Sequence, residues 1–177
     1  MVNGTKNIRN MINKIYHIAD VHIRNVKRHK EYREVFKRLY SYIKKTKTNN
    51  DVIYVAGDIV HAKTDMSPEL VDLVSEFFTN LADLLPTIII LGNHDCNLNN
   101  NYRLDALSPI VKAINHKNIH YLKDNGVYEV QGVHFNVMGV DEKPTNYLKA
   151  NDFEGNYKIA LHHGSVHNAS TDAGFTL

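Results

Sequence analysis

Four apolar stretches of the chain end in residues that bind metal ions or exchange protons. The four endings are Asp20-Val21-His22, Gly57-Asp58-Ile59-Val60-His61, Gly92-Asn93-His94-Asp95 and His162-His163-Gly164. Carboxylate, imidazole and amide donors, without any thiolate, suit divalent ions such as Mn²⁺, Fe²⁺ or Zn²⁺. Two such ions about 3.5–4 Å apart can share a hydroxide and hold both the attacking and the leaving oxygen of a phosphoryl ester. The pattern therefore predicts a hydrolytic centre with two metal ions, bridged by Asp58.

Alternating strands and helices must position these residues. Short apolar runs typical of buried strands lie at residues 15–19, 52–56, 87–91 and 158–161, and helical apolar stripes lie at residues 32–43, 67–84 and, more weakly, 108–114. Ser67 and Pro68 are typical of a helix start, and Pro86 of a helix end. Because ligands of open α/β sheets bind beyond the carboxyl ends of the strands, we expect the four endings to converge on one site.

The second half of the chain is mostly β in pattern. Further strands are predicted at residues 119–122, 127–130 and 133–140, with turns at Asn125-Gly126 and Gln131-Gly132. Strands that alternate with helices, followed by a run of strands, favour one α/β unit of packed sheets over two separate domains. We therefore assign residues 1–14 to an N-terminal extension and residues 15–177 to a single domain.

Composition excludes several classes of protein. The 177 residues are 43% hydrophobic and 23% charged, as in a globular chain that can bury a core, and the single cysteine, Cys96, excludes an internal disulfide. No apolar run reaches the roughly 20 residues of a membrane-spanning helix, and the polar start lacks a secretory signal. The sequence predicts an intracellular protein that is neither secreted nor bound to a membrane.

A basic segment directly follows the first of the four endings. Residues 24–47 carry ten of the 21 Lys and Arg residues and two of the 19 acidic ones. This segment has two interpretations: the solvated face of an amphipathic helix, or a surface that holds DNA phosphates without reading the sequence. In the second interpretation the contacts come from Arg24, Lys27, Arg28 and Lys30.

The combined motifs resemble the calcineurin-like metallophosphoesterases, whose pattern is D-x-H, G-D-x-x-[DH], G-N-H-[DE], a later H and a final G-H-x-H. The resemblance implies an αββα sandwich of two packed mixed sheets flanked by helices, with two divalent metal ions. Mn²⁺ is the favoured metal, and Fe²⁺, Zn²⁺ and Mg²⁺ are alternatives. By the resemblance, Asp20 and His22 bind the first ion, Asp58 bridges, and Asn93 and His162 bind the second ion.

The resemblance also implies roles for residues that bind no metal. His94 would stabilise the transferring phosphoryl group or protonate the leaving oxygen, and Asp95 would orient His94. His61 either touches the substrate or a metal-bound group, or is an ordinary loop histidine. His163 is expected to be a structural neighbour of His162, because adjacent residues of a strand point in different directions.

Within this superfamily, His61 and residues 28–36 look like the SbcD-type nucleases of DNA double-strand-break repair. That resemblance implies a manganese-dependent DNA exonuclease or endonuclease that hydrolyses backbone phosphodiesters. It also implies DNA and an SMC-like coiled-coil ATPase as partners, and a homodimer formed by the stripe of Tyr32, Phe36 and Tyr40, unless that stripe is core. The alternatives are a small-molecule phosphatase or cyclic-nucleotide phosphodiesterase, and a scaffold that has lost catalysis.

The final G-H-x-H block of the pattern is absent, and the late His167 does not replace it. By the resemblance, this block supplies one histidine to each ion, so the domain is expected to be truncated at its C-terminal end. Loss of a ligand from each ion predicts weaker metal binding and slower turnover.

Overall fold

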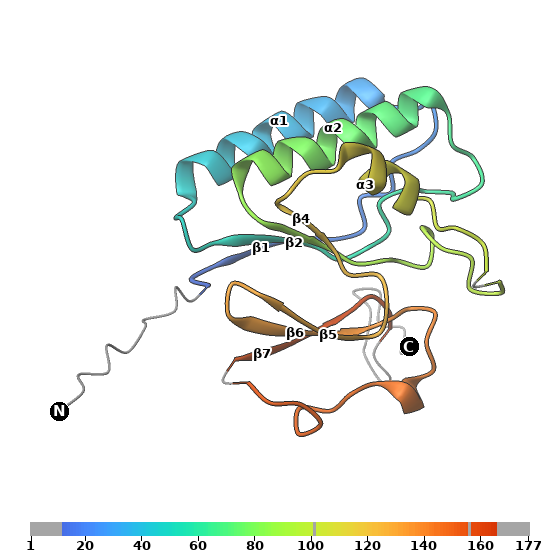
Figure 1. Cartoon of the computed structure of the whole chain (residues 1–177). Helices are drawn as coiled ribbons and strands as arrows, with labels where there is room; N and C mark the ends of the chain where they lie inside the picture. The colour runs from blue at the N-terminus through green and yellow to red at the C-terminus, as the bar shows by residue number, and fades with distance from the viewer. Residues whose placement is uncertain (1–11, 101, 156, 166–177) are drawn as a thin grey trace, which may run out of the picture.

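The computed structural model describes residues 12–100, 102–155 and 157–165 of the chain. These residues form two sheets that pack face to face, with three α-helices on one side (Figure 1). The strands are β1 (Ile15–Ile18), β2 (Val52–Val55), β3 (Thr87–Ile89), β4 (Ile119–Tyr121), β5 (Gly126–Val130), β6 (Val133–Met138) and β7 (Lys158–His162). The helices are α1 (His29–Thr46), α2 (Pro68–Leu84), α3 (Ser108–Ile114) and the short 3₁₀ helix η1 (Pro144–Asn146).

The first sheet brings the ends of its strands to one edge. Its order is β1-β2-β3-β4, and every neighbouring pair is parallel. Ile18 pairs with Val55, and Val55 pairs with Ile89, so β1, β2 and β3 finish side by side. Three of the four chemically active endings are thereby placed next to one another by strand register alone.

The helices cover the outer face of this sheet. Ser67 caps α2 by accepting a hydrogen bond from the Leu70 amide at 3.2 Å, and Pro68 occupies the first turn, as predicted. Phe36 of α1 is buried and stacks on Phe77 of α2, with ring centroids 4.2 Å apart. Tyr32 and Tyr40 pack partly buried against the same core.

The second sheet has the order β5-β6-β7, in which β5 and β6 are antiparallel and β6 and β7 are parallel. A second apolar core fills the space between the sheets, with Tyr54 and Ile88 from one side and Phe135 and Leu161 from the other. The parallel pairing of β6 with β7 aligns the end of β7 with Met138 at the end of β6. It also brings the fourth ending to the edge of the sandwich where the other three lie.

The predicted α/β architecture of two packed sheets is confirmed. The first sheet is wholly parallel and only the second is mixed, because β1 to β4 are joined by helical crossovers whereas β5 and β6 form a hairpin. The three described α-helices all lie on the first sheet (Figure 1), and the second sheet faces η1 and its flanking loops. None of the helices in the described ranges has the length and apolar character needed to cross a bilayer.

Candidate metal centre

The loops that follow β1 and β2 are joined by backbone hydrogen bonds. The His22 amide donates to the Asp58 carbonyl at 2.9 Å, and the Ile23 amide donates to the Ile59 carbonyl at 2.8 Å. Asp20, His22 and Asp58 all have left-handed backbone angles, with φ of 54°, 48° and 53°. Three such residues in one site indicate backbone strain held by the surrounding structure, which is a mark of functional sites.

Two glycines allow the second and third loops to touch. Gly57 has a φ of +82°, and a Cβ placed on it would lie 2.5 Å from the Gly92 nitrogen. A Cβ on Gly92 would lie 2.1 Å from Asp58 Oδ1 and 2.2 Å from the Asp58 nitrogen. Both positions therefore require glycine, because any side chain would separate Asp58 from the loop that carries Asn93 and His94.

Asp58 lies between two histidines. Its side chain is almost fully buried, and its Oδ2 is 3.4 Å from His22 Nε2 and 3.3 Å from His163 Nε2. Asp20 Oδ1 is 3.7 Å from the same nitrogen of His22, and Asn93 Oδ1 is 3.1 Å from His163 Nε2. Asp58 is thus shared by two donor groups: Asp20 and His22 on one side, Asn93 and His163 on the other.

Of the two adjacent histidines at the end of β7, His163 lies next to Asp58 and Asn93. The Nδ1 of His163 donates to the Ala56 carbonyl at 2.7 Å, which leaves its Nε2 directed at Asn93 and Asp58. His162 turns the other way: its Nδ1 donates to the Met138 carbonyl, and its ring packs against Tyr147. In this geometry His162, expected to bind the second ion, contacts Met138, and His163, expected to be its neighbour, lies beside Asp58. His167 lies outside the described residues.

This placement gives a direct prediction for metal binding. We expect His163→Ala to weaken Mn²⁺ binding at least about 10-fold, since it removes a donor beside Asp58, whereas His162→Ala leaves the affinity near that of the wild type. Isothermal titration of both variants measures the difference. Weaker Mn²⁺ binding in His162→Ala alone would show that His162, and not His163, points at Asp58.

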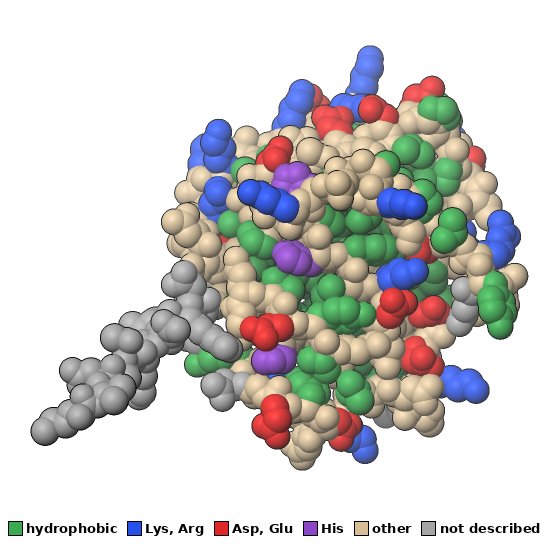
Figure 2. Space-filling model, in the orientation of Figure 1, with side chains coloured by type: hydrophobic (Ala, Val, Ile, Leu, Met, Phe, Trp, Pro, Cys, Tyr) green, Lys and Arg blue, Asp and Glu red, His purple; other side chains and the backbone are tan. Residues whose placement is uncertain are grey.

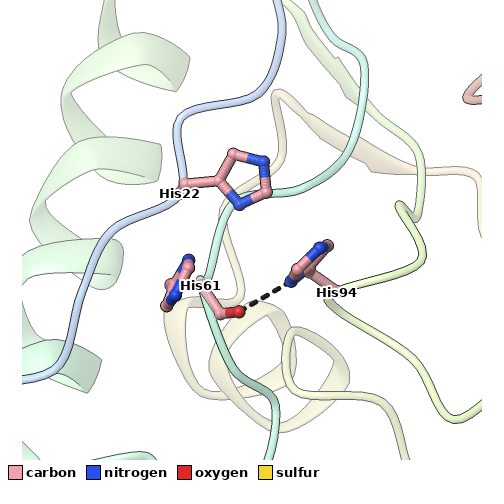
Figure 3. A group of neighbouring side chains, drawn as sticks. All are labelled: His22, His61 and His94. Carbon is pink, nitrogen blue, oxygen red and sulfur yellow. Dashed lines mark hydrogen bonds between the residues drawn. The ribbon is translucent and has the colours of Figure 1, made fainter.

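A group of three histidines shares His22 with the pair of Asp20 and His22. The rings of His22, His61 and His94 face one another (Figure 3), and His22 and His94 have centroids 4.7 Å apart at 90°. His94 Nδ1 lies 2.7 Å from the His61 carbonyl oxygen. Because a carbonyl only accepts, Nδ1 carries a proton, and Nε2 is the atom of His94 that can give or take one.

The surroundings keep His61 uncharged. Partial removal from water lowers the pKa of His61, and the positive charge of Arg24 and the neighbouring His22 and His94 lower it further. Its imidazole is therefore neutral near pH 7.

Asp95 does not orient His94, contrary to the role that the resemblance implied. Its buried carboxylate accepts hydrogen bonds from the amides of Ile59 at 2.9 Å, Val60 at 3.0 Å and Gly92 at 3.0 Å. The His61 carbonyl orients His94 instead. Asp95 holds the second and third loops together, because its acceptors bind amides of both loops.

Burial makes Asp95 a source of pH-dependent stability. Desolvation raises the pKa of Asp95 to about 6, against the opposing effect of its amide partners and with a further increase from Asp58. The folded chain binds this proton more tightly than the unfolded chain, so the contribution of Asp95 to stability falls as pH rises from about 4 to about 6. We expect Asp95→Asn, which cannot ionise, to gain stability relative to the wild type across this range.

Urea denaturation with EDTA at pH 4.5 and pH 7 measures the effect, with the same substitution at the exposed Asp141 as the control. A stability difference between Asp95→Asn and the wild type that does not change with pH would contradict a buried, titrating carboxylate.

Lys63 contacts the site although no sequence motif marks it. Its ammonium donates to the Asn93 carbonyl at 3.2 Å and so joins the loop after β2 to the Asn93 turn. No family motif singles it out, and its only signal in the sequence is a positive charge two residues after His61.

The basic segment lies at the border of the site. Arg24, Lys27, Arg28 and Lys30 are all exposed, and Arg28 forms an ion pair with Glu31. Figure 2 shows Lys and Arg side chains over the helices, with acidic side chains among them. The mixed charge is typical of a solvated helix face, whereas Arg24 and Lys27 of the loop before α1 are exposed and form no ion pair within the described ranges.

The donor set fits divalent metal ions. Ligand atoms of Asp20, His22 and Asp58 lie within 4.8 Å of one another, as do those of His22, His61 and His94. The Nδ1 atom of His22 is also buried and has no hydrogen-bond partner among the described residues. Buried polar atoms are nearly always satisfied, so this nitrogen indicates that an ion or a water completes the site.

Comparisons with known proteins show which proteins this chain is similar to. A family model described as calcineurin-like phosphoesterase matches residues 13–176. An uncharacterized protein of Acanthamoeba polyphaga mimivirus is 44% identical over 176 residues, which are 94% of this chain and only 13% of that protein. Among solved structures, the Pseudomonas putida nuclease MPE is 20% identical, covers 73% of this chain and 53% of its own, and has a TM-score of 0.43. A protein of unknown function from Aquifex aeolicus is 16% identical over 71% and 60% of the two chains, with a TM-score of 0.35.

Proposed function

Because the chain belongs to the calcineurin-like phosphoesterase family, we propose that it is a metal-dependent phosphodiesterase that cleaves the backbone of DNA. Family membership implies hydrolysis of phosphoesters with divalent metal ions. The observation that carries the finer proposal is the shared Asp58, flanked by two donor groups and bordered by the exposed positive charge of the loop before α1.

Five residues would hold the metal ions in this proposal. Asp20 and His22 would bind one ion, Asn93 and His163 the other, and Asp58 both. Bound ions supply the positive charge that activates water and stabilises the oxygens of a phosphoryl group. His163 donates from Nδ1 to the Ala56 carbonyl, which leaves Nε2 as the free nitrogen that a metal ligand needs.

The role of His94 follows from its tautomer. Nδ1 donates to the His61 carbonyl, so Nε2 is the free ring nitrogen: it accepts a proton when the ring is neutral and donates one when the ring is cationic. A cationic His94 can protonate the leaving oxygen of a sugar, which would otherwise depart as a poor alkoxide leaving group. The ring of His61 lies beside it, with centroids 5.9 Å apart.

The charge around the site favours a polyanion as the substrate. Arg24 and Lys27 are exposed and form no ion pair within the described ranges, so they are free to contact phosphates on either side of the scissile bond. Binding should therefore weaken steeply with salt. A DNA-repair role, an SMC-like ATPase partner and a homodimer remain predictions of the sequence resemblance.

Hydrolysis assays with Mn²⁺ on single-stranded DNA, duplex DNA and bis-p-nitrophenyl phosphate test the proposal. We expect cleavage of DNA that is lost in EDTA, together with binding whose logarithm falls linearly with the logarithm of salt concentration. Cleavage of the chromogenic diester with none of either DNA would instead support a small-molecule phosphodiesterase. No hydrolysis of any of the three, with the metal ions bound, would support a scaffold.

A further inference from the structure

The loop between the metal centre and α1 exposes an apolar side chain at its tip. Val26 is 67% exposed and has a left-handed backbone with φ of 50°. A β-branched residue rarely adopts this conformation, since its side chain crowds the backbone, and an exposed valine gains nothing from burial in return. Backbone strain of this kind persists only where the surrounding structure imposes it, and such strained residues cluster at functional sites.

The base of this loop is fixed on both sides of Val26. Asn25 Nδ2 donates to Asp65 Oδ1 at 2.5 Å, and Asn25 Oδ1 accepts from the Ser67 amide at 3.3 Å. The ring of His29 donates from Nε2 to the Arg24 carbonyl at 2.8 Å. These anchors hold the tip in one conformation, so Val26 projects without the entropic cost of ordering a mobile loop on binding.

The surroundings of the tip suit nucleic acid. Arg24 follows Ile23, whose carbonyl accepts a hydrogen bond from the His61 amide at 3.0 Å, so the loop begins beside the histidine group. Lys27 follows Val26 directly and is exposed. A single apolar side chain between two cations matches a duplex, in which phosphates flank a stack of apolar base faces.

We propose that Val26 is a wedge that enters the base stack of a DNA duplex next to the metal centre and separates the strand to be cut. The inference rests on the proposed function, because it names the duplex form of that substrate. Apolar side chains inserted at a base step unstack it at a cost of a few kcal/mol. Arg24 and Lys27 would offset that cost by holding the phosphates on each side.

The variant Val26→Asn tests the wedge without damaging the fold. Asparagine tolerates the left-handed region better than valine does, so the variant should be at least as stable in urea. Val26→Leu keeps an apolar tip and should retain function. Val35→Asn, at an exposed valine on α1 outside the loop, is the matched control.

The first readout is fluorescence from 2-aminopurine placed at the end of a duplex, in EDTA so that no hydrolysis occurs. We expect the wild type, Val26→Leu and Val35→Asn to raise the fluorescence as the base unstacks, and Val26→Asn to leave it unchanged. The second readout is the ratio of duplex to single-strand cleavage with Mn²⁺, which should fall at least about 10-fold in Val26→Asn alone.

An unchanged ratio and unchanged fluorescence response in Val26→Asn would overturn the wedge and leave the nuclease proposal intact. Absence of DNA cleavage by the wild type would overturn the nuclease proposal, and the fluorescence in EDTA would still decide whether Val26 opens a duplex.

Discussion

Replacement of His94 by alanine is expected to slow DNA hydrolysis by about 10²–10⁴-fold, the usual contribution of a positioned general acid. Mn²⁺ binding should stay near the wild-type level, because Asp58 and its two donor groups remain. The His94 amide also donates to Asp58 Oδ1 at 2.9 Å, and this backbone contact survives the substitution. Cleavage rates at saturating Mn²⁺ measure the loss, and His17→Ala, at an exposed histidine of β1, is the control.

The leaving group makes this test sharper. A p-nitrophenolate departs without protonation, whereas a deoxyribose alkoxide does not. If Nε2 of His94 delivers the proton, His94→Ala should lose much less activity on bis-p-nitrophenyl phosphate than on DNA. Equal losses on both would show that His94 stabilises the phosphoryl group and does not protonate. Loss of Mn²⁺ binding would place His94 among the ligands, with His22 and His61.

The largest effect on stability is expected from Gly92→Ala. The new Cβ would lie 2.1 Å from Asp58 Oδ1 and 2.2 Å from the Asp58 nitrogen, both parts of a buried and strained turn that has no space to move. Overpacking of this kind costs up to about 3 kcal/mol and occasionally more. The midpoint of thermal unfolding should then fall by roughly 10 °C for a chain of this size.

Gly139→Ala is the matched control for this substitution. A Cβ on Gly139 would lie 3.2 Å from Asp141 Oδ1, which belongs to an exposed side chain that can turn away. We expect a change of less than about 1 kcal/mol. A wild-type midpoint for Gly92→Ala, in EDTA, would mean that the loops after β2 and β3 do not touch as described.

Much of the fold follows from local signals in the sequence. Val52–Val55 and Thr87–Ile89 are short apolar runs that end in glycine turns, and Ser67-Pro68 starts α2 where its capping chemistry predicts. Register was harder to predict. Whether a strand ends one residue earlier or later changes nothing in its apolar pattern, yet it decides which of His162 and His163 points at Asp58.

The supporting contacts of the site could not be read from the sequence at all. Asp95 lies next to His94 in the chain, which suggested a contact between them, but it binds amides that belong to the loop after β2. Such contacts depend on how closely two loops approach, and that approach is set by Gly57 and Gly92 together. The motifs predict which residues a site contains, whereas tertiary packing determines which atoms each of these side chains contacts.

The parallel order of the first sheet also has a consequence for folding kinetics. Each parallel pair forms only after an intervening crossover has closed, so contacts distant in the chain dominate, and such chains fold slowly. The two histidines that flank Asp58 belong to opposite ends of the described chain, His22 after β1 and His163 after β7. They can meet only when both sheets have formed and packed. A metal ion that requires both would therefore engage after the folding barrier, and would prolong the lifetime of the native state without hastening its formation.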